Sequence, residues 1–211
     1  MLQTVPSPPV ATVSALTPAD SPSALDTLVK AFHKDPGAVH MFPDSAQRCA
    51  GIREVFAFGL NYARRFGCVD LLNQGRAVAM WIPPEYSPPS WRRSFKSGLV
   101  ATAFRLGRSA MRVIRFSRFM ESRRVRVMRA PHWYLFCIGV HPDQQGRGLG
   151  AALLQHGLAR ARTTGAPCYL ETVNAGNVPF YRAHGFHELG RHEFSHCGPV
   201  IWSLATANLA A

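Results

Sequence analysis

A glycine-rich segment has the residue types and spacing with the clearest chemical meaning in this chain. Residues 136–154 read FCIGVHPDQQGRGLGAALL, an apolar strand, a short turn and three glycines at alternate positions, Gly146, Gly148 and Gly150. A helical pattern follows. Glycine lets a ligand approach the backbone closely, and the N–H groups at a helix start point toward one place at the positive end of the helix dipole. The segment therefore predicts a site that holds a phosphate or pyrophosphate without a metal ion.

Two known phosphate-binding loops fit this segment less well. A P-loop ends in Gly-Lys followed by Ser or Thr, whereas Gly150 is followed by Ala151. The dinucleotide pattern of a Rossmann fold matches literally at Gly146, Gly148 and Ala151, with Glu171 about 20 residues further on. However, that loop places its first glycine directly after the strand, and only about 60 residues remain here to form the rest of the sheet. The dinucleotide interpretation is therefore the weaker one.

A third loop type fits both this segment and a second one downstream. Residues 145–150 resemble the signature of the GNAT family of N-acetyltransferases, in which Gln or Arg, two residues, Gly, one residue, and Gly or Ala follow a strand. About 30 residues later, residues 174–186 (NAGNVPFYRAHGF) resemble the second element of the family, asparagine, then Phe-Tyr, then Gly-Phe. The resemblance covers roughly residues 10–205 and is weakest in the basic segment 90–130. It implies an enzyme that transfers acetyl from acetyl-CoA to an amine.

The resemblance also implies which residues bind acetyl-CoA. Backbone amides of 145–150 would hold the pyrophosphate, and strand 138–140 would hydrogen-bond the pantetheine arm as an added strand does. Arg147 either adds charge at a phosphate or is a solvated loop cation. Asn177 is expected to cap a helix and to contact the pantetheine. The expected cofactor-binding residues are Ile138, Gly139, Val140, Gln145, Gly146, Arg147, Gly148, Leu149, Gly150, Asn177 and Phe180.

Two side chains are candidates for proton transfer. Tyr181 occupies the motif position at which many family members place the general acid, and an ordinary pKa near 10 suits donation to a departing thiolate; the alternative is an aromatic packing residue. Glu171 follows an apolar run, so it is either a general base with a raised pKa or an exposed carboxylate at a strand end, and a water chain can replace a base. The Val140 N–H is expected to face the thioester oxygen.

Charge is concentrated in one part of the chain. The net charge is +12, and residues 90–130 hold twelve Lys or Arg residues opposed only by Glu121. Such a segment is attracted to nucleic acid, an anionic membrane or phosphates, or it is the solvated face of one or two amphipathic helices with a break near Gly107. We expect it to be a lid over the acceptor side. No nucleic-acid motif is present, so a nucleic-acid partner is not expected.

Composition places further bounds on the protein. The chain has 211 residues, 47% of them apolar, and no apolar run near the roughly 20 residues that span a membrane. The start of the chain does not read as a secretory signal, and the five cysteines are scattered without a CxxC pair, as in a reduced cytoplasmic protein. No metal is expected, because the spacing of His184, His187, His192 and His196 fits no standard ligand set.

The remaining patterns predict the elements that must position these residues. Residues 1–9 are expected to be a tail, 10–16 a strand, and Ser21-Pro22 the start of a helix that ends at Asp35-Pro36. A helix from about Asp44, a hairpin of strands 68–72 and 77–82, and strand 132–140 follow. After the glycine loop come a helix ending at Gly165, a strand 168–173, a short helix ending at Gly185, and strands 186–194 and 200–204. Gly139 indicates a bulge that opens its strand.

Together these predict an α/β (α+β) protein with a GNAT-like mixed, V-shaped split β-sheet flanked by helices, formed by one acetyltransferase domain over 10–205 with a basic helical insertion at about 90–130. The expected acceptor is a primary amine on a small molecule, such as an aminonucleoside or another antibiotic, which would make the enzyme an antibiotic-resistance protein. A protein or peptide N-acetyltransferase is one alternative. A basic module that binds nucleic acid or an anionic surface is another. A homodimer is left open.

Overall fold

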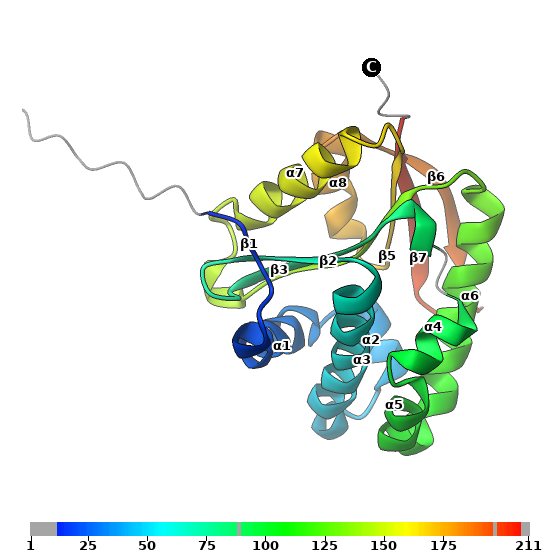
Figure 1. The fold of residues 1–211 in the computed structure, drawn as a ribbon. Helices are drawn as coiled ribbons and strands as arrows, with labels where there is room; N and C mark the ends of the chain where they lie inside the picture. Colours follow the sequence, from blue (N-terminus) through cyan, green and yellow to red (C-terminus); the bar gives the residue numbers. More distant parts are fainter. Residues whose placement is uncertain (1–11, 88–89, 196–197, 208–211) are drawn as a thin grey trace, which may run out of the picture.

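The fold is a seven-stranded sheet with helices on both faces (Figure 1). The computed structural model describes residues 12–87, 90–195 and 198–207, so the expected tail 1–9, the first two residues of the expected strand 10–16, Cys197 and His196 lie outside the described residues. The strand order is β1-β2-β3-β4-β5-β7-β6. The strands are β1 (Ser14–Ala15), β2 (Cys68–Leu72), β3 (Ala77–Ile82), β4 (Trp133–Val140), β5 (Cys168–Thr172), β6 (Phe186–Glu193) and β7 (Val200–Thr206).

The sheet splits between its two central strands. β4 and β5 are the parallel pair, and their ladder contains only Trp133–Leu135 on β4 and Cys168–Leu170 on β5. Beyond these residues β4 remains paired with β3 up to Val140, while β5 pairs with β7 up to Thr172. The carboxyl-terminal halves of β4 and β5 therefore belong to two diverging antiparallel arms. This confirms the predicted mixed, split sheet flanked by helices.

Two layers of helices cover the sheet. Figure 1 shows α7 and α8 on one side and α1, α2 and α3 on the other, with the green helices α4, α5 and α6 grouped beyond α3. The alternation of side chains along a strand sends neighbouring residues to these two layers. The helices are α1 (Ser21–Phe32), α2 (Pro36–Met41), α3 (Ser45–Phe66), α4 (Trp91–Lys96), α5 (Leu99–Leu106), α6 (Ala110–Val127), α7 (Leu149–Arg162) and α8 (Val178–Ala183).

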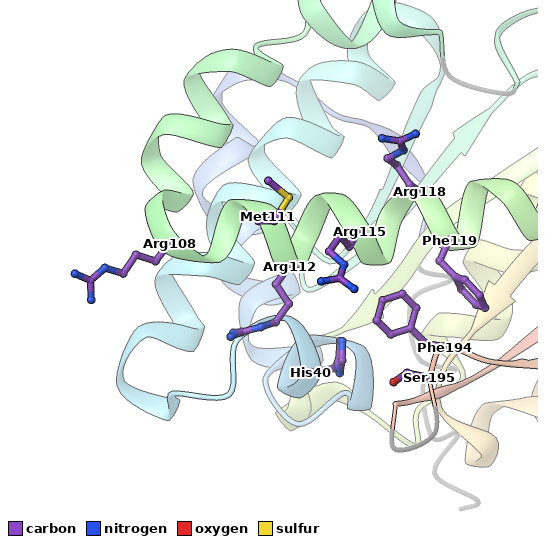
Figure 2. A pocket seen from close by; sticks show the side chains of 9 residues that line it. All are labelled: His40, Arg108, Met111, Arg112, Arg115, Arg118, Phe119, Phe194 and Ser195. Carbon is purple, nitrogen blue, oxygen red and sulfur yellow. The ribbon is translucent and has the colours of Figure 1, made fainter.

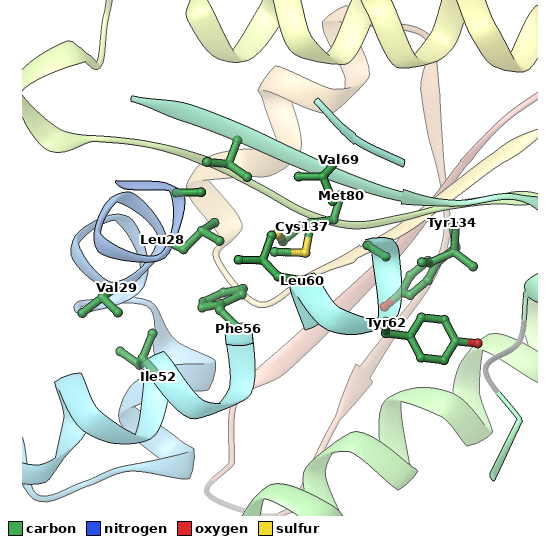
Figure 3. Packing of buried hydrophobic residues seen from close by; sticks show 14 of the residues in the cluster. Leu28, Val29, Ile52, Phe56, Leu60, Tyr62, Val69, Met80, Tyr134 and Cys137 are labelled. Carbon is green, nitrogen blue, oxygen red and sulfur yellow. The ribbon is translucent and has the colours of Figure 1, made fainter. Parts of the chain in front are cut away.

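Each face of the sheet has its own hydrophobic core. On the α1 and α3 side, Leu28, Phe56 and Leu60 pack against Met80, as Figure 3 shows, with further buried residues of β4 and β5. On the α7 and α8 side, Leu153 and other buried leucines of α7 pack against Trp81, Leu135, Leu170 and Phe186. The two cores hold α1 against one face of the central strands and α7 against the other face.

The fold corrects three local predictions. The helix that begins at Ser21 ends at Phe32 as expected, but Asp35 and Pro36 also start a new helix, α2. There the Asp35 carboxylate accepts hydrogen bonds from the N–H groups of Gly37 and Ala38. Proline at the first helical position is compatible with a helix start, since its missing N–H has no acceptor there. The basic segment holds three helices rather than one or two, because Gly98 (φ +96°) adds a second break to the one at Gly107.

The third correction concerns the bulge in β4. The register shift lies at Phe136, which is the extra residue between the pairs Met80–Cys137 and Trp81–Leu135. Gly139 itself pairs regularly with Val78. A Cβ at Gly139 would lie 2.9 Å from Leu28 Cδ2 of α1, so this glycine is required by close helix packing and not by a bulge.

The described residues were also compared with the expectations for cysteines, membrane spans and metal sites. In the described residues, Cys49, Cys68, Cys137 and Cys168 carry free thiols. No helix in the described ranges is long and apolar enough to cross a membrane. A search of the same residues finds no group of three or more His, Cys, Asp or Glu side chains that could hold a metal ion.

Candidate active site

The split exposes backbone polar groups of β4. In an antiparallel ladder, residues alternate between those that bond to the partner strand and those whose N–H and C=O point away from it. The His141 N–H donates to the Arg76 carbonyl (2.9 Å), so the next residue, Val140, and then Ile138 point their backbone groups away from β3. That side is where β5 has diverged. The N–H groups of Ile138 and Val140 therefore face the open part of the split.

The glycine loop follows β4 and leads into α7. Gly146 and Gly148 have φ values of +75° and +76°, a conformation that side chains disfavour, and a Cβ at either glycine would meet no atom within 4 Å. The Gln145 side chain donates from Nε2 to the Val140 carbonyl (3.1 Å) and ties the loop to the strand. Arg147 is exposed. The loop is thus fixed at its base and open where a ligand would approach.

The start of α7 has unused hydrogen-bond donors. Gly148 is its N-cap and offers no side chain, and the Ala152 N–H makes the first bond, to the Gly148 carbonyl (3.0 Å). The amides of Leu149, Gly150 and Ala151 precede that bond and are available to an anion. Three backbone donors at the positive end of a 14-residue helix fit a pyrophosphate group.

The second sequence motif forms α8 beside this loop. The Phe180 ring lies next to the start of α7, since a Cβ at Gly150 would be 3.9 Å from Phe180 Cζ. Asn177 precedes α8, but its side chain caps no N–H group, which corrects the expected capping role. Asn174 caps the short 3-10 turn Ala175–Asn177 before α8, where its side chain accepts from the Gly176 N–H (3.0 Å). Asn177 is exposed, so its side chain is available for another contact.

Tyr181 is buried on α8 near the split. Only 7% of the side chain is exposed, and its hydroxyl makes no hydrogen bond with the described residues. Burial raises the pKa of Tyr181 well above its usual value near 10, and the Cys137 thiol and the Asp35 carboxylate raise it further. The ordinary pKa expected from the sequence is therefore wrong. The phenol keeps its proton and lies within electrostatic reach of groups from β4 and from the start of α2.

Glu171 lies on β5, close enough to Arg124 of α6 to be affected by its charge. The Tyr169 hydroxyl donates to Glu171 Oε1 (3.0 Å), while Oε2 is buried without a hydrogen-bond partner in the described residues. Burial raises the pKa of the Glu171 carboxyl, whereas the charge of Arg124 and hydrogen bonds from Tyr134 and Tyr169 oppose the shift. Of the two readings of this residue, an exposed strand-end carboxylate is wrong. Glu171 is half-buried, its Oε2 atom is fully buried, and burial raises the pKa of its carboxyl.

The basic helix α6 brings Arg124 close to this carboxyl. Arg124 is 3% exposed, lies 4.2 Å above the centre of the Tyr134 ring and pairs with Glu121 one turn earlier. A buried guanidinium needs such partners, because removing a charge from water is costly. Arg124 is therefore packed close to Glu171. Other arginines of the basic segment line a separate cleft.

A cleft of about 760 Å³ opens between α2, α6 and the end of β6 (Figure 2). Its walls are His40 of α2, Arg108 just before α6, a row of three arginines along α6, and Phe194 and Ser195 just after β6. The sequence analysis did not identify His40, Phe194 or Ser195, because these residues belong to no recognisable motif. It identified only the arginines, as part of the basic segment. The lining residues are His40, Arg108, Met111, Arg112, Arg115, Arg118, Phe119, Phe194 and Ser195.

Packing joins the cleft to the split. A Cβ at Gly37, the second residue of α2, would lie 3.0 Å from Val173, which follows β5, and 3.5 Å from Phe116 of α6. The Phe116 ring in turn contacts His40 and Phe194, with ring centres 5.7 and 5.3 Å apart. The cleft therefore lies at the carboxyl end of β5, the end at which β5 diverges from β4. Glu171 is not one of its lining residues.

The described geometry thus has two halves. A backbone cradle at β4 and α7 suits a phosphate-bearing ligand, and a separate cleft on the other arm suits a second molecule. Ligands of open α/β sheets commonly bind at the carboxyl ends of diverging strands. Tyr181 and Glu171, the two candidate proton-transfer residues, come from the elements around the split.

Comparison with solved structures shows the same fold elsewhere. The chain is similar to a histone acetyltransferase HPA2 and related acetyltransferase from Corynebacterium glutamicum, with a TM-score of 0.67 and 26% identity over 95% of this chain and 98% of that one. The ribosomal-protein-S18-alanine N-acetyltransferase from Escherichia coli has a TM-score of 0.55 and 21% identity, covering 96% of both chains. A polyamine N-acetyltransferase of Drosophila melanogaster has a TM-score of 0.57 and 14% identity, covering 92% and 98%.

Sequence comparison identifies the family. Over 175 residues the chain is 28% identical to an uncharacterized N-acetyltransferase of Schizosaccharomyces pombe, and the match covers 79% of this chain and 70% of the relative. Residues 72–186, more than half of the chain, match the model of the acetyltransferase (GNAT) family, whose members use acetyl-CoA. The chain belongs to the GNAT acetyltransferase family and is an acyltransferase.

Proposed function

We propose that this protein transfers the acetyl group of acetyl-CoA to a primary amine of a small molecule. The observation that supports the donor is the combination of three unpaired backbone amides at the start of α7 with the unpaired edge of β4. The first suits a pyrophosphate, and the second suits the amides of an extended pantetheine arm. No side chain in the described loop blocks either approach.

The proposed donor site uses the residues expected from the sequence. Amides of Gly146, Gly148, Leu149 and Gly150 would hold the pyrophosphate, with Gln145 fixing the loop and Arg147 adding charge. Ile138 would bond the pantetheine arm, the Val140 N–H would meet the thioester at the end of that arm, Gly139 would let α1 support the strand, and Asn177 and Phe180 would line the other side of the arm. These assignments rest on the geometry of the loop, of β4 and of α8.

The reaction forms an amide bond and breaks a thioester. The amine nitrogen bonds to the acetyl carbon and loses one proton, the carbon–sulfur bond breaks, and the departing thiolate gains one proton. We assign the Val140 N–H to the carbonyl oxygen, Glu171 to the acceptance of the amine proton, directly or through water, and Tyr181 to the donation of a proton to sulfur. The raised pKa of Tyr181 ensures that its hydroxyl is protonated when the thiolate departs.

The small-molecule acceptor is proposed from the cleft. Its volume of about 760 Å³ falls within the range of roughly 300–1,000 Å³ that holds small ligands. Residues 31–32, 77–81, 139–145 and 170–172 are also similar to puromycin N-acetyltransferase. This similarity supports an aminonucleoside or another antibiotic-like amine, a role in antibiotic resistance, and a cytoplasmic location. The domain we propose covers residues 10–205, with the basic segment inserted as a lid.

A protein or peptide acceptor is the main alternative. One fold relative is named as acting on alanine of a ribosomal protein and another as a polyamine acetyltransferase, so the shared fold is compatible with both classes of acceptor. The walls of this cleft come from three separate elements, but the cleft is open to solvent, so its shape is compatible with a peptide as well. The proposal of a small molecule therefore rests on the volume of the cleft.

Calorimetry with acetyl-CoA and the purified protein tests the donor, and release of free CoA thiol across a panel of primary amines and peptides tests the acceptor. We expect binding of acetyl-CoA and amine-dependent thiol release for small amines. A protein that binds no acetyl-CoA would contradict the proposal. Thiol release with peptides alone would replace the small-molecule acceptor by a peptide.

A further inference from the structure

The cleft beside α6 has a strong positive charge that the described protein does not neutralise. Four arginines line it: Arg108 just before α6, and Arg112, Arg115 and Arg118 at three-residue spacings along α6. In the described part of the chain, none of the four forms an ion pair with a carboxylate. Four like charges around one cleft repel each other, so an anion bound there would relieve a cost already present in the folded protein.

Two of these arginines point toward the acceptor space. In Figure 2, Arg112 and Arg115 leave α6 on the side of His40 and Phe194, whereas Arg118 leaves the helix on the other side. Arg112 donates to the Met41 carbonyl (3.3 Å) and so keeps its guanidinium close to the end of α2. Arg115 makes no hydrogen bond or ion pair with the described residues.

The remaining wall is aromatic and uncharged. Phe194 lies between His40 and Phe119, with ring centres 5.0 and 5.1 Å away. Burial lowers the pKa of His40, and the nearby charge of Arg112 lowers it further, so the imidazole is neutral at pH 7. Of the lining residues outside the basic segment, His40, Phe194 and Ser195 thus add no charge, while the Glu193 carboxylate next to Phe194 does not line the cleft. The arginines alone set the charge that a ligand meets.

We propose that the acetyl acceptor is a small amine that also carries an anionic group, a phosphate or a carboxylate, bound by Arg112 and Arg115 against the rings of His40 and Phe194. Guanidinium groups bind both anions through paired N–H donors, and a planar ring or apolar stem fits the aromatic wall. This inference rests on the proposed function, because it names the class of acceptor for that reaction. It disfavours acceptors that bear a second positive charge.

The cleft is also separate from the cradle for the CoA phosphates. In Figure 1 the β2–β3 hairpin lies at the left, and α6 at the right. The glycine loop follows His141, which is bonded to Arg76 of that hairpin. One arm of the sheet therefore holds the backbone cradle and the other holds the arginines. The anion that Arg112 and Arg115 bind belongs to the second substrate.

Matched acceptor pairs test the charge preference. The probes are tyramine O-phosphate against tyramine, and 4-(aminomethyl)benzoate against 4-(aminomethyl)benzamide and 4-(aminomethyl)benzylamine. Each pair keeps the ring and the amine and changes only the distal charge. We expect the anionic member to show a kcat/KM at least about tenfold higher, the size expected for hydrogen bonds to a charged group.

Variants locate the preference. Arg115→Gln and the double variant Arg112→Gln, Arg115→Gln should raise KM for the anionic probes about tenfold or more and remove the difference within each pair, with acetyl-CoA affinity unchanged. Arg115→Gln is the cleaner change, because Arg115 supports no other described residue. Arg126→Gln is the matched control, since Arg126 is an exposed arginine of α6 that does not line the cleft. The control should keep the preference.

Each outcome decides between the proposals. Equal or better use of the neutral or cationic probes, or a preference that survives in the double variant, would overturn the anionic acceptor and leave the acetyltransferase proposal standing. A protein that fails to bind acetyl-CoA would overturn both. Inhibition by a single-stranded oligonucleotide that Arg115→Gln relieves, with no anionic probe acetylated, would assign the cleft to nucleic acid and also overturn the inference.

Discussion

The two halves of the site that we propose, one for the acetyl donor and one for the acceptor, are built on different principles. The donor half is almost continuous in sequence, since β4, the glycine loop and the start of α7 follow each other from Trp133 to Ala151, and it presents backbone amides. The acceptor half joins α2, α6 and the end of β6, and it presents side chains. Backbone amides can bind a group that is common to many ligands, such as a pyrophosphate. Side chains differ from protein to protein and can therefore select one substrate.

The two halves also differ in charge and packing. The donor cradle attracts phosphate through a helix terminus, with only the exposed Arg147 nearby. The acceptor cleft carries four arginines beside a cluster of aromatic rings. This difference predicts that changes in one half alter the handling of one substrate and leave the other substrate unaffected. Four variants test that separation, in order of decreasing expected effect.

The largest effect is expected at Gly150. A Cβ there meets only ordinary contacts, Val140 Cγ2 at 3.6 Å and Phe180 Cζ at 3.9 Å, so a longer residue can be accommodated. Gly150→Glu places a carboxylate where the pyrophosphate should bind, and like charges about 4 Å apart near a protein surface cost on the order of 4 kcal/mol. We expect the Kd for acetyl-CoA to rise on the order of 1,000-fold by calorimetry.

The control for this variant is Gly150→Gln, which has the same size without the charge. It should weaken acetyl-CoA binding far less, and neither variant should change the affinity of the cleft for tyramine O-phosphate. A negative charge at a helix start also stabilises the helix, so Gly150→Glu should keep or raise Tm. Equal losses of acetyl-CoA affinity in the two variants would argue against a pyrophosphate at this position.

Tyr181→Phe tests the transfer step between the halves. The hydroxyl has no described partner, so its removal should leave the free energy of unfolding unchanged or slightly raised. If the hydroxyl donates the proton to sulfur, kcat should fall about 100-fold, the lower end of the range for acid catalysis, at unchanged acetyl-CoA affinity. Steady-state kinetics and thermal unfolding measure both. Wild-type turnover in Tyr181→Phe would remove this residue from the acid role.

Glu171→Gln tests the base through pH. The raised pKa of Glu171 keeps its carboxyl protonated above the usual range near 4.5, so kcat/KM should fall as pH drops through that raised value. The variant should lose this acidic limb and about tenfold in rate, since water can take over part of the proton transfer. An unchanged pH profile in Glu171→Gln would show that another group accepts the proton.

The pH dependence of protein stability is an independent test of the raised pKa of Glu171. A raised pKa means that the folded state binds protons more tightly than the unfolded state, so this contribution is present below the ordinary pKa and is lost as pH rises through the folded value. Denaturant unfolding between pH 4 and 8 should therefore show a smaller loss of stability with rising pH in Glu171→Gln than in the wild type. Conversely, a steeper loss in the variant would mean that Arg124 needs the carboxylate more than burial disfavours it.

The smallest effect is expected at Gly37. Its ideal Cβ lies 3.0 Å from Val173 Cγ2, so Gly37→Ala should displace the start of α2 slightly and cost about 1 kcal/mol of stability. Because α2 carries His40, KM for the acceptor should rise a few-fold while the Kd for acetyl-CoA stays constant. Val39→Ala on the exposed side of α2 is the control and should change neither. A change in acetyl-CoA affinity would show that the two halves are coupled.

Much of the fold was predictable because local rules specify it. The Asp44 cap, the hairpin over Asn73, Gln74 and Gly75, and the stop at Gly185 lie where the sequence placed them. Predictions failed where a second cause competed with the local one. Asp35-Pro36 ends one helix and starts the next, and Gly139 reflects the proximity of Leu28 in α1 rather than a bulge in its own strand.

Some parts of the candidate site were likewise predictable from the sequence and others were not. The loop 145–150, the edge of β4 and the position of Tyr181 were predictable, because their geometry depends on residues a few positions apart. The half-buried position of Glu171 near the charge of Arg124 was not, since these residues come from β5 and α6 and approach each other only in the folded chain. His40, Phe194 and Ser195 carry no local signal at all.

By itself, the sequence determined the donor half: glycines at alternate positions between a strand and a helix specify a backbone cradle wherever they occur. Only the tertiary structure decided the acceptor half, because the same arginines could have covered any solvated helix face. They line a cleft because α6 packs against α2 and the end of β6, which bring the rings of His40 and Phe194 to face them. Periodicity places residues on a helix face, but long-range packing decides what that face meets.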